Sequence, residues 1–260
     1  MRAILPILVI SIAFAATAAG AASPLDNAAL PGQTRYERCL YLAQKRPQQA
    51  LDAAQSWRDE GAGAPARHCA AVALVGLKRY AEAGSTLDQL ARDPATGAPA
   101  NRAVLFDQAG NAWLLARRAE AAEVSLTAAL NLMPGDPDIL TDRARARAMR
   151  KDWSGADADL TAVLARDPRR PDLLVLRASA RRALKRANGA RADVDKALAL
   201  RPNYDEALLE RGALRFDAGD KIGARADWQA VIGRAPKGPA AAAARTRIEQ
   251  LDASAPAAKN

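Results

Sequence analysis

Residues 137–168 read PDILTDRARARAMRKDWSGADADLTAVLARDP, and residues 171–202 read PDLLVLRASARRALKRANGARADVDKALALRP. The two stretches align without a gap at a spacing of 34 residues, and each closes on a proline. The same spacing relates four prolines along the chain, which are Pro134, Pro168, Pro202 and Pro236. A fixed period of this length is the sequence signature of an array of stacked helical units.

Four consecutive windows of 34 residues share one apolar pattern when they start at Ala103, Pro137, Pro171 and Asp205. Position 20 of each window is alanine, and positions 24, 27 and 28 are apolar. These offsets describe one stripe of an α-helix. In chain order the four positions hold Ala122, Leu126, Ala129 and Leu130; Ala156, Leu160, Val163 and Leu164; Ala190, Val194, Ala197 and Leu198; and Ala224, Trp228, Val231 and Ile232.

Each window is therefore predicted to hold two amphipathic helices joined by a short turn. Position 4, in the earlier helix, is also large and apolar. The closing proline cannot extend the helix before it, and Asp136 followed by Pro137 is typical of a helix start. One such hairpin cannot bury its own apolar stripe, so neighbouring hairpins must stack. Only 4% of the 260 residues are aromatic and Ala, Leu and Arg dominate, which favours an all-α fold.

The four windows resemble the tetratricopeptide repeat family, whose signature has Gly or Ala at position 8, Ala at 20 and Pro at 32. Gly110 and Gly212 stand at position 8 in two windows, and Trp113 supplies the aromatic residue expected at position 11. The other windows depart from the family at position 11, where they carry arginine (Arg147, Arg181 and Arg215). The resemblance covers residues 103–236 and implies a right-handed α-α solenoid.

The flanking regions extend this array less regularly. Residues 31–93 are predicted to form two degenerate hairpins, so that the chain has about six in all. An insertion then breaks the spacing, and residues 94–102 are predicted to be a linker. Residues 237–252 are predicted to form a capping helix, and residues 253–260 a disordered tail.

The N-terminus has the layout of a secretory signal peptide. Met1 and Arg2 give a positive start, an apolar run follows from Ala3 to Ala16, and small residues precede Ser23. We expect cleavage of residues 1–22 and a periplasmic location. An uncleaved membrane anchor is the alternative, but the run is shorter than the ~20 residues that span a bilayer. No later stretch is apolar enough to cross a membrane.

The two cysteines, Cys39 and Cys69, are predicted to form a disulfide, since an even number in an exported chain favours one. Two separate thiols or a redox pair are the alternatives, but the chain has no C-x-x-C. The family resemblance implies that both cysteines lie on the first helices of adjacent hairpins, where a disulfide would stabilise the N-terminal end of the array.

Opposite charges recur inside the windows. Position 7 is Arg143, Arg177 and Arg211 in three windows, and position 23 is Asp159, Asp193 and Asp227 in the same three. We interpret these as repeated ion pairs between the two helices of a hairpin, shared with the arginine at position 11. Chance coincidence in a chain that is 26% charged is the alternative.

The composition gives little support to catalysis. The chain has a single histidine, His68, and no phosphate-binding glycine loop, so we expect no enzyme activity, no cofactor and no metal. The net charge of +9 and the arginine run at 143–151 raise nucleic-acid binding as an alternative. Export and the scarcity of aromatic residues oppose it.

The family resemblance implies a concave groove lined by the first helices, at positions 2, 5, 9, 12 and 13. The residues carried over are Asp107, Asn111, Leu114, Leu115, Thr141, Arg145, Met149, Val175, Ser179, Arg182, Leu209 and Phe216. Arg145 and Arg182 suggest that a peptide with an acidic residue would suit this groove. We therefore expect a periplasmic scaffold that binds a protein or peptide. The alternative is a structural subunit of an envelope or secretion assembly, engaged through the outer face or the ends of the array.

Overall fold

The computed structural model describes residues 34–253, and this part contains thirteen α-helices, one short 3-10 helix and no strand. The predicted signal peptide and the tail from residue 254 onward lie outside the described residues. The helices are α2 (Arg35–Lys45), α3 (Pro47–Asp59), α4 (Ala64–Gly76), α5 (Tyr80–Arg92), η1 (Pro94–Thr96), α6 (Pro99–Leu115), α7 (Ala119–Leu132), α8 (Pro137–Met149), α9 (Trp153–Arg166), α10 (Pro171–Ala183), α11 (Ala187–Leu200), α12 (Asp205–Asp217), α13 (Lys221–Arg234) and α14 (Pro239–Ala253).

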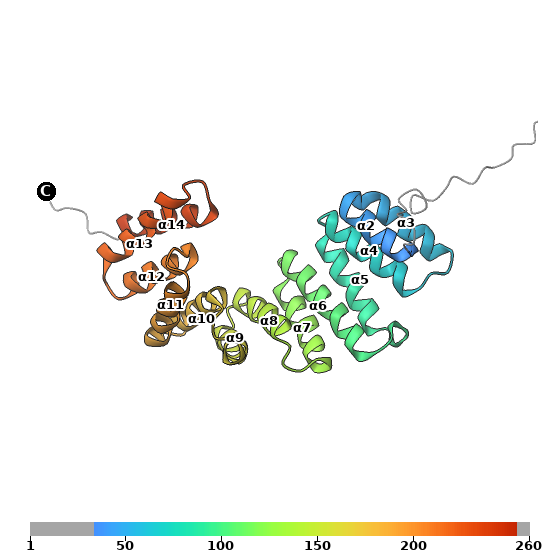
Figure 1. Cartoon of the computed structure of the whole chain (residues 1–260), viewed down its shortest axis with the longest axis horizontal. Helices are drawn as coiled ribbons and strands as arrows, with labels where there is room; N and C mark the ends of the chain where they lie inside the picture. Colours follow the sequence, from blue (N-terminus) through green and yellow to red (C-terminus); the bar gives the residue numbers. More distant parts are fainter. Residues whose placement is uncertain (1–33, 254–260) are drawn as a thin grey trace, which may run out of the picture.

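The helices pair into six hairpins that follow one another along an arc, with α14 covering the last hairpin (Figure 1). Each hairpin consists of a first helix (α2, α4, α6, α8, α10 or α12) and a second helix (α3, α5, α7, α9, α11 or α13). Both ends of the arc turn toward the same side, so the array has a concave and a convex surface (Figure 1). The all-α solenoid predicted from the 34-residue period is confirmed.

Five of the six hairpins use the same turn between their helices. The residue at position 15 has a positive φ in each, at Lys78 (60°), Arg117 (57°), Lys151 (63°), Lys185 (61°) and Gly219 (86°). The N–H of the next residue donates to the carbonyl five residues back, at 2.8–2.9 Å. This is the Schellman closure, which satisfies carbonyls left open at the end of a helix. Repeating this turn gives the hairpins a common connection between their two helices.

Small residues bring the helices of a hairpin close together. The alanine at position 20 is fully buried in all four regular windows. A Cβ added at Gly110 would lie 2.4 Å from Leu126, and one added at Gly212 would lie 2.3 Å from Trp228. These contacts explain why glycine stands at position 8 in these two windows, where a large side chain fills position 24.

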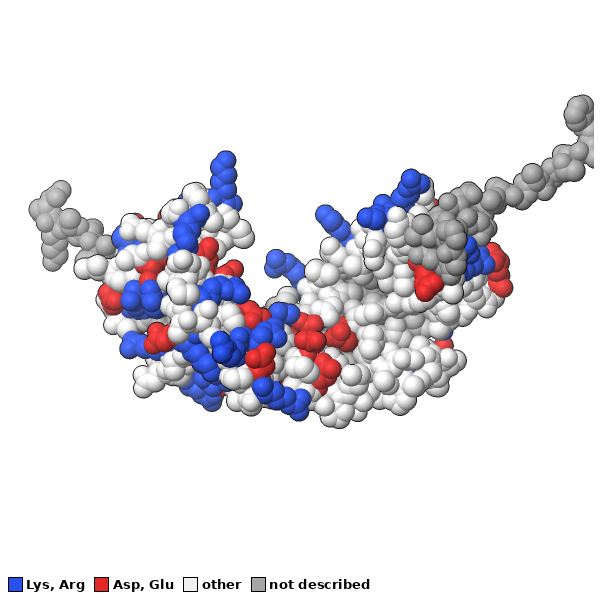
Figure 2. All heavy atoms as spheres, viewed as in Figure 1, with Lys and Arg blue, Asp and Glu red and all other residues white. Residues whose placement is uncertain are grey.

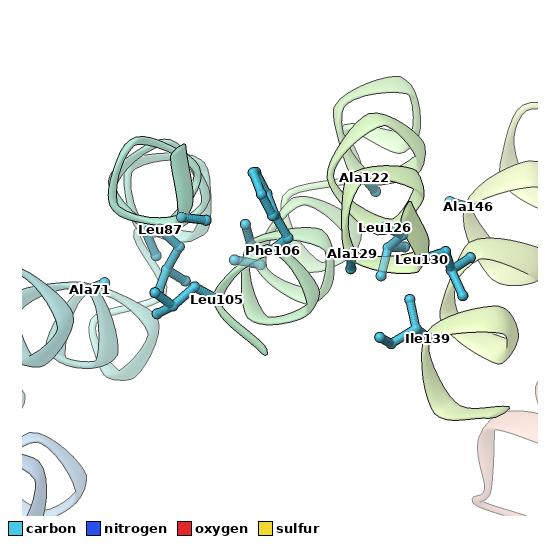
Figure 3. Close-up of a cluster of buried hydrophobic side chains, with 14 of the residues drawn as sticks. Ala71, Leu87, Leu105, Phe106, Ala122, Leu126, Ala129, Leu130, Ile139 and Ala146 are labelled. Atoms are coloured by element: carbon cyan, nitrogen blue, oxygen red, sulfur yellow. The ribbon is translucent and has the colours of Figure 1, made fainter. Parts of the chain in front are cut away.

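Between hairpins, large aliphatic side chains interdigitate. Figure 3 shows Leu87 and Leu105 directed toward each other, and Leu126 and Leu130 directed toward Ile139. One apolar cluster continues in this way from α2 to the start of α12. A second cluster, centred on the buried Trp228, joins α12, α13 and α14.

Cys39 on α2 and Cys69 on α4 form a disulfide, with a Cα–Cα distance of 6.0 Å. Both residues are fully buried. The bridge closes a loop of 30 residues, which in the chain-entropy model stabilises the fold by about 3–4 kcal/mol. It therefore holds together the first two hairpins, whose repeat pattern is the least regular.

Two element boundaries differ from those predicted. The linker expected at 94–102 is shorter, because α6 begins at Pro99 and η1 occupies part of the remainder. Proline suits the first helical position because it has no N–H group that would need an acceptor there, and the residues after it are compatible with a helix. At the other end, α14 includes Ala253, which was assigned to the tail. Within the described residues, no helix is both long and apolar enough to cross a bilayer.

Candidate functional site

The concave surface is formed by one face of each first helix. Most of the expected groove residues recur at intervals of three, four or seven along α6, α8, α10 and α12, so they share a face on each helix. Leu115 and Met149 are exposed, at 55% and 45%. Thr141 corrects the expectation, because it is buried and its hydroxyl donates to the Pro137 carbonyl at 2.8 Å. The other groove residues keep part of their surface open to solvent.

Two adjoining pockets, of about 350 and 240 Å³, lie along α4 and α6 and share Gln108. The smaller pocket is apolar except for the amides of Gln108 and Asn111, and exposed Leu115 forms part of its wall. The other residues that line the smaller pocket are Val72, Val75, Leu87 and Ala112. Together the two pockets make a mainly apolar depression in the concave surface.

A chain of hydrogen bonds crosses the larger pocket. The Tyr36 hydroxyl lies 2.7 Å from His68 Nδ1, and His68 Nε2 lies 2.7 Å from Gln108 Oε1. The Gln108 oxygen can only accept, so His68 Nε2 is the donor of this hydrogen bond. The single histidine thus connects three first helices and positions the Gln108 amide.

Sequence reasoning missed the α4 side of this depression. His68, Val72 and Val75 have the i, i+4, i+7 spacing of a helix face, which could have identified it. The insertion after residue 93 removed the common register, so no groove positions were transferred to α4.

Acidic side chains gather near the centre of the arc, on the side of the array that Figure 2 shows. Burial raises the pKa of Asp107 to about 6, and the nearby charges of Asp142, Asp136 and Asp138 add to this. Arg145 offsets only part of this cluster, because its charge is paired with Asp142 at 2.5 Å. Arg182 is likewise paired, with Glu210 and Asp217. Neither arginine is therefore available as the acid-binding group that the sequence suggested.

The structure brings together all three predicted pairs between positions 7 and 23. Arg143 donates through Nε and Nη2 to both oxygens of Asp159, at 3.0 and 2.8 Å. The same two-pronged geometry recurs between Arg177 and Asp193 and in the following window. Each of the three aspartates is only 4% exposed.

The arginine at position 11 links one hairpin to the previous one. Arg181 Nη1 donates to Asp193 in its own hairpin at 2.9 Å, and its Nε donates to Asp157 of the preceding hairpin at 2.8 Å. Arg147 does the same with Asp159 and Glu123. The departure from the family at position 11 therefore replaces an aromatic contact with a bridging ion pair.

The bridge is modified at both ends of the regular array. In the first window, Trp113 takes the place of the arginine, and its ring lies where a Cβ on Gly84 would sit. Its indole N–H donates to buried Asp88 at 2.8 Å. In the last window, Arg215 pairs with Asp227 at 2.8 Å and lies 3.9 Å from Asp220, both in its own hairpin. The position in the preceding hairpin that holds an acid in the earlier windows is Arg191 here.

Substituting Asp193→Ala should lower the free energy of unfolding by about 3 kcal/mol, because it leaves Arg177 and Arg181 without their shared partner. The matched control is Asp195→Ala, an exposed carboxylate on the same helix, which should change it by less than about 0.5 kcal/mol. Urea unfolding measures both values. Equal effects would mean that the buried ion pair contributes no more to the free energy of unfolding than an exposed charge does.

The pKa of Asp107 predicts a pH-dependent stability. Its folded pKa of about 6 exceeds the ordinary value of 3.8, so its contribution is complete below about pH 4 and is lost as the pH rises through 6. Asp107→Asn should therefore stabilise the chain at pH 7.5 by about 1 kcal/mol, allowing for solvent screening, and leave it unchanged at pH 4.

Thermal unfolding at the two pH values provides the measurement, with exposed Asp59→Asn as the control. A stabilisation by Asp107→Asn that is the same at pH 4 and pH 7.5 would contradict the expected protonation.

Solved structures with the same architecture are tetratricopeptide repeat proteins. MamA from residue 41 to its end, from Desulfovibrio magneticus RS-1, matches with a TM-score of 0.58 at 18% identity, covering 65% of this chain and 93% of that one. A thermophilic repeat protein from Thermus thermophilus matches at 0.54 and 16%, covering 74% and 100%.

YrrB, described as a repeat protein with an unusual peptide-binding site, matches at 0.56 and 12%, covering 74% and 96%. No protein-family model and no curated protein sequence matches the chain. At these identities the likeness is one of fold. The chain has the fold of the tetratricopeptide repeat proteins.

Proposed function

We propose that this chain is a non-enzymatic scaffold that binds a segment of a partner protein on its concave surface. The observation that carries the proposal is the pair of adjoining pockets along α4 and α6. Val104 and Leu115 stand at these pockets with about half of their surface exposed, at 49% and 55%. Exposed apolar side chains beside preformed pockets are typical of a surface that buries them against a ligand.

The polar groups of the depression suit a peptide. The side-chain amides of Gln108 and Asn111 both donate and accept, as the backbone of an extended segment requires. Apolar side chains of the segment would fill the space beside Val72 and Leu115, as in other groove-bound peptides. The description of YrrB as a protein with a peptide-binding site agrees with this use of the fold.

Charge further defines the partner. The acidic group around Asp107 and Asp142 occupies the middle of the groove. A segment that crosses the middle would therefore bind better with a basic residue there, in place of the acidic one suggested by Arg145 and Arg182. Both arginines already have carboxylate partners within the chain.

One pair of substitutions separates concave from convex binding. Leu115 on α6 and Val124 on the second helix α7 are equally exposed, at 55% and 56%. Peptides selected from a displayed library against the purified chain should lose at least about tenfold in affinity with Leu115→Asp, because a charge would enter the apolar pocket. Val124→Asp should leave their affinity unchanged.

Fluorescence anisotropy with the selected peptides gives both affinities. The opposite result, in which Val124→Asp abolishes binding and Leu115→Asp does not, would favour engagement through the outer face. Thermal unfolding checks that both variants remain folded.

We also propose that the scaffold acts in the periplasm. The support is the buried disulfide between Cys39 and Cys69, because such bonds persist in oxidising compartments and are rare in the cytosol. The N-terminal sequence has the three-part layout that export requires.

Expression of the full chain in a Gram-negative bacterium tests the proposed periplasmic location. Osmotic shock should release a protein whose mass corresponds to the loss of about 22 residues and to one disulfide. A chain that lacks residues 2–22 serves as the control and should stay in the cytoplasm. Recovery of the uncleaved chain with two free thiols would refute the proposed location.

A further inference from the structure

A pocket of about 540 Å³ lies at the C-terminal end of the array, between α10, α12 and α14. These helices continue the row that forms the concave surface. The pocket combines two arginines with aromatic and amide groups, and the residues that define it are Arg182, Phe216, Asp217, Trp228, Arg247 and Gln250. It lies on the last hairpin and its cap, away from the depression along α4 and α6.

Arg182 is fully engaged within the protein. Its Nε donates to Glu210 at 2.6 Å, and its Nη1 donates to Asp217 at 3.3 Å. Burial opposes the charge of Arg182, but the charge of Glu210 and these hydrogen bonds raise its pKa above the ordinary value. Arg182 is therefore already paired with carboxylates of the protein itself.

Arg247 on α14 is in the opposite situation. Its guanidinium is partly buried, yet it makes no hydrogen bond or ion pair within residues 34–253. Burial lowers its pKa, and the nearby charge of Glu210 does not reverse this. A guanidinium that loses water without gaining a partner weakens the folded state.

We propose that this pocket binds the carboxylate of a ligand or partner segment, with Arg247 as the pairing residue. The planar guanidinium offers paired N–H groups that match the two oxygens of a carboxylate. Phe216 and buried Trp228 lie 6.2 Å apart, and the Trp228 N–H is already used by the Leu209 carbonyl at 3.2 Å. Phe216, which packs on Trp228 and keeps part of its surface open, offers apolar surface to a side chain next to the carboxylate. This site is independent of the apolar depression at the other end of the array.

The test uses N-acetyl-L-phenylalanine and its amide as probes, because they differ only in the carboxylate. The free acid should bind saturably, with a dissociation constant on the order of 1 mM, and should shift the Nε–H resonance of Arg247. The amide should bind at least about tenfold more weakly. Calorimetry and arginine-detected NMR provide the two readouts. Equal binding of acid and amide, or no binding of either, would overturn the proposal.

Substitutions assign the effect to Arg247. Arg247→Gln should reduce acid binding at least about tenfold, whereas Lys237→Gln, which removes an exposed charge just before α14, should have no effect. Because the Arg247 guanidinium has no partner among the described residues, Arg247→Leu should leave the Tm unchanged or raise it. A lower Tm for Arg247→Leu would show that the arginine is structural and would count against a binding role.

Two peptides separate the sources of the carboxylate. Acetyl-Ala-Ala-Phe with a free C-terminus carries a terminal carboxylate, and acetyl-Ala-Glu-Phe-Ala-amide carries only a side-chain one. Binding of either supports the site, and the tighter of the two identifies the kind of segment that it accepts. Failure of both peptides, with Leu115→Asp still abolishing library binding, would overturn the carboxylate site and leave the concave groove in place.

Discussion

Every hairpin of this chain has an apolar stripe that only the next hairpin can cover, and the rest of the structure depends on this constraint. A single pair of helices buries too little to be stable, so the array must be continuous from α2 to its cap. The alanine at position 20 and the glycine or alanine at position 8 let the helices approach closely enough for Leu126 and Trp228 to fill the space between them. The first and the last hairpin each lack a neighbour on one side, and a different feature stabilises each of them. A disulfide holds the first two hairpins together, and α14 covers the last one.

Stacking alone does not fix the register of one hairpin against the next, because alanine-rich stripes can slide at little cost. The buried aspartate at position 23 supplies the missing specificity. In the second and third windows it accepts three N–H bonds from two arginines, and one of these arginines also reaches an acid in the preceding hairpin. A buried ion pair adds little net stability, but a wrong register would leave its charges unpaired. The bridge is missing where Arg191 precedes the last hairpin, and there Arg182 connects α10 to α12 on the concave side through Glu210.

The fold and the ion pairs could be predicted because they repeat. Arg143 and Asp159 are separated by the same number of residues as their counterparts in the next two windows, so the same contact is indicated three times in one sequence. What does not repeat could not be predicted. The reach of Arg181 to Asp157 needs the angle between hairpins, which position numbers do not contain. The pairing of Arg182 with Glu210 likewise joins two hairpins, and it removed an arginine from the expected groove. The pockets on α4 were missed because the insertion after residue 93 shifts the register.

Residues that the array needs for its stability can be distinguished from residues that stacking does not require. Repeated positions such as Asp159 and Ala156 are buried and satisfied, and the packing and ion pairs between helices explain their chemistry. Leu115 and Arg247 are different, because each leaves a group in an unfavourable state. The first is an apolar side chain in water, and the second is a guanidinium without a partner among the described residues. Stacking does not explain the exposed Leu115 or the unpaired Arg247, and a bound segment would bury the first and pair with the second. The two lie on different hairpins of the array, on α6 and on the cap α14, so the array offers chemically different contacts along one face. A solenoid can separate such contacts widely because each hairpin is held by its neighbours alone.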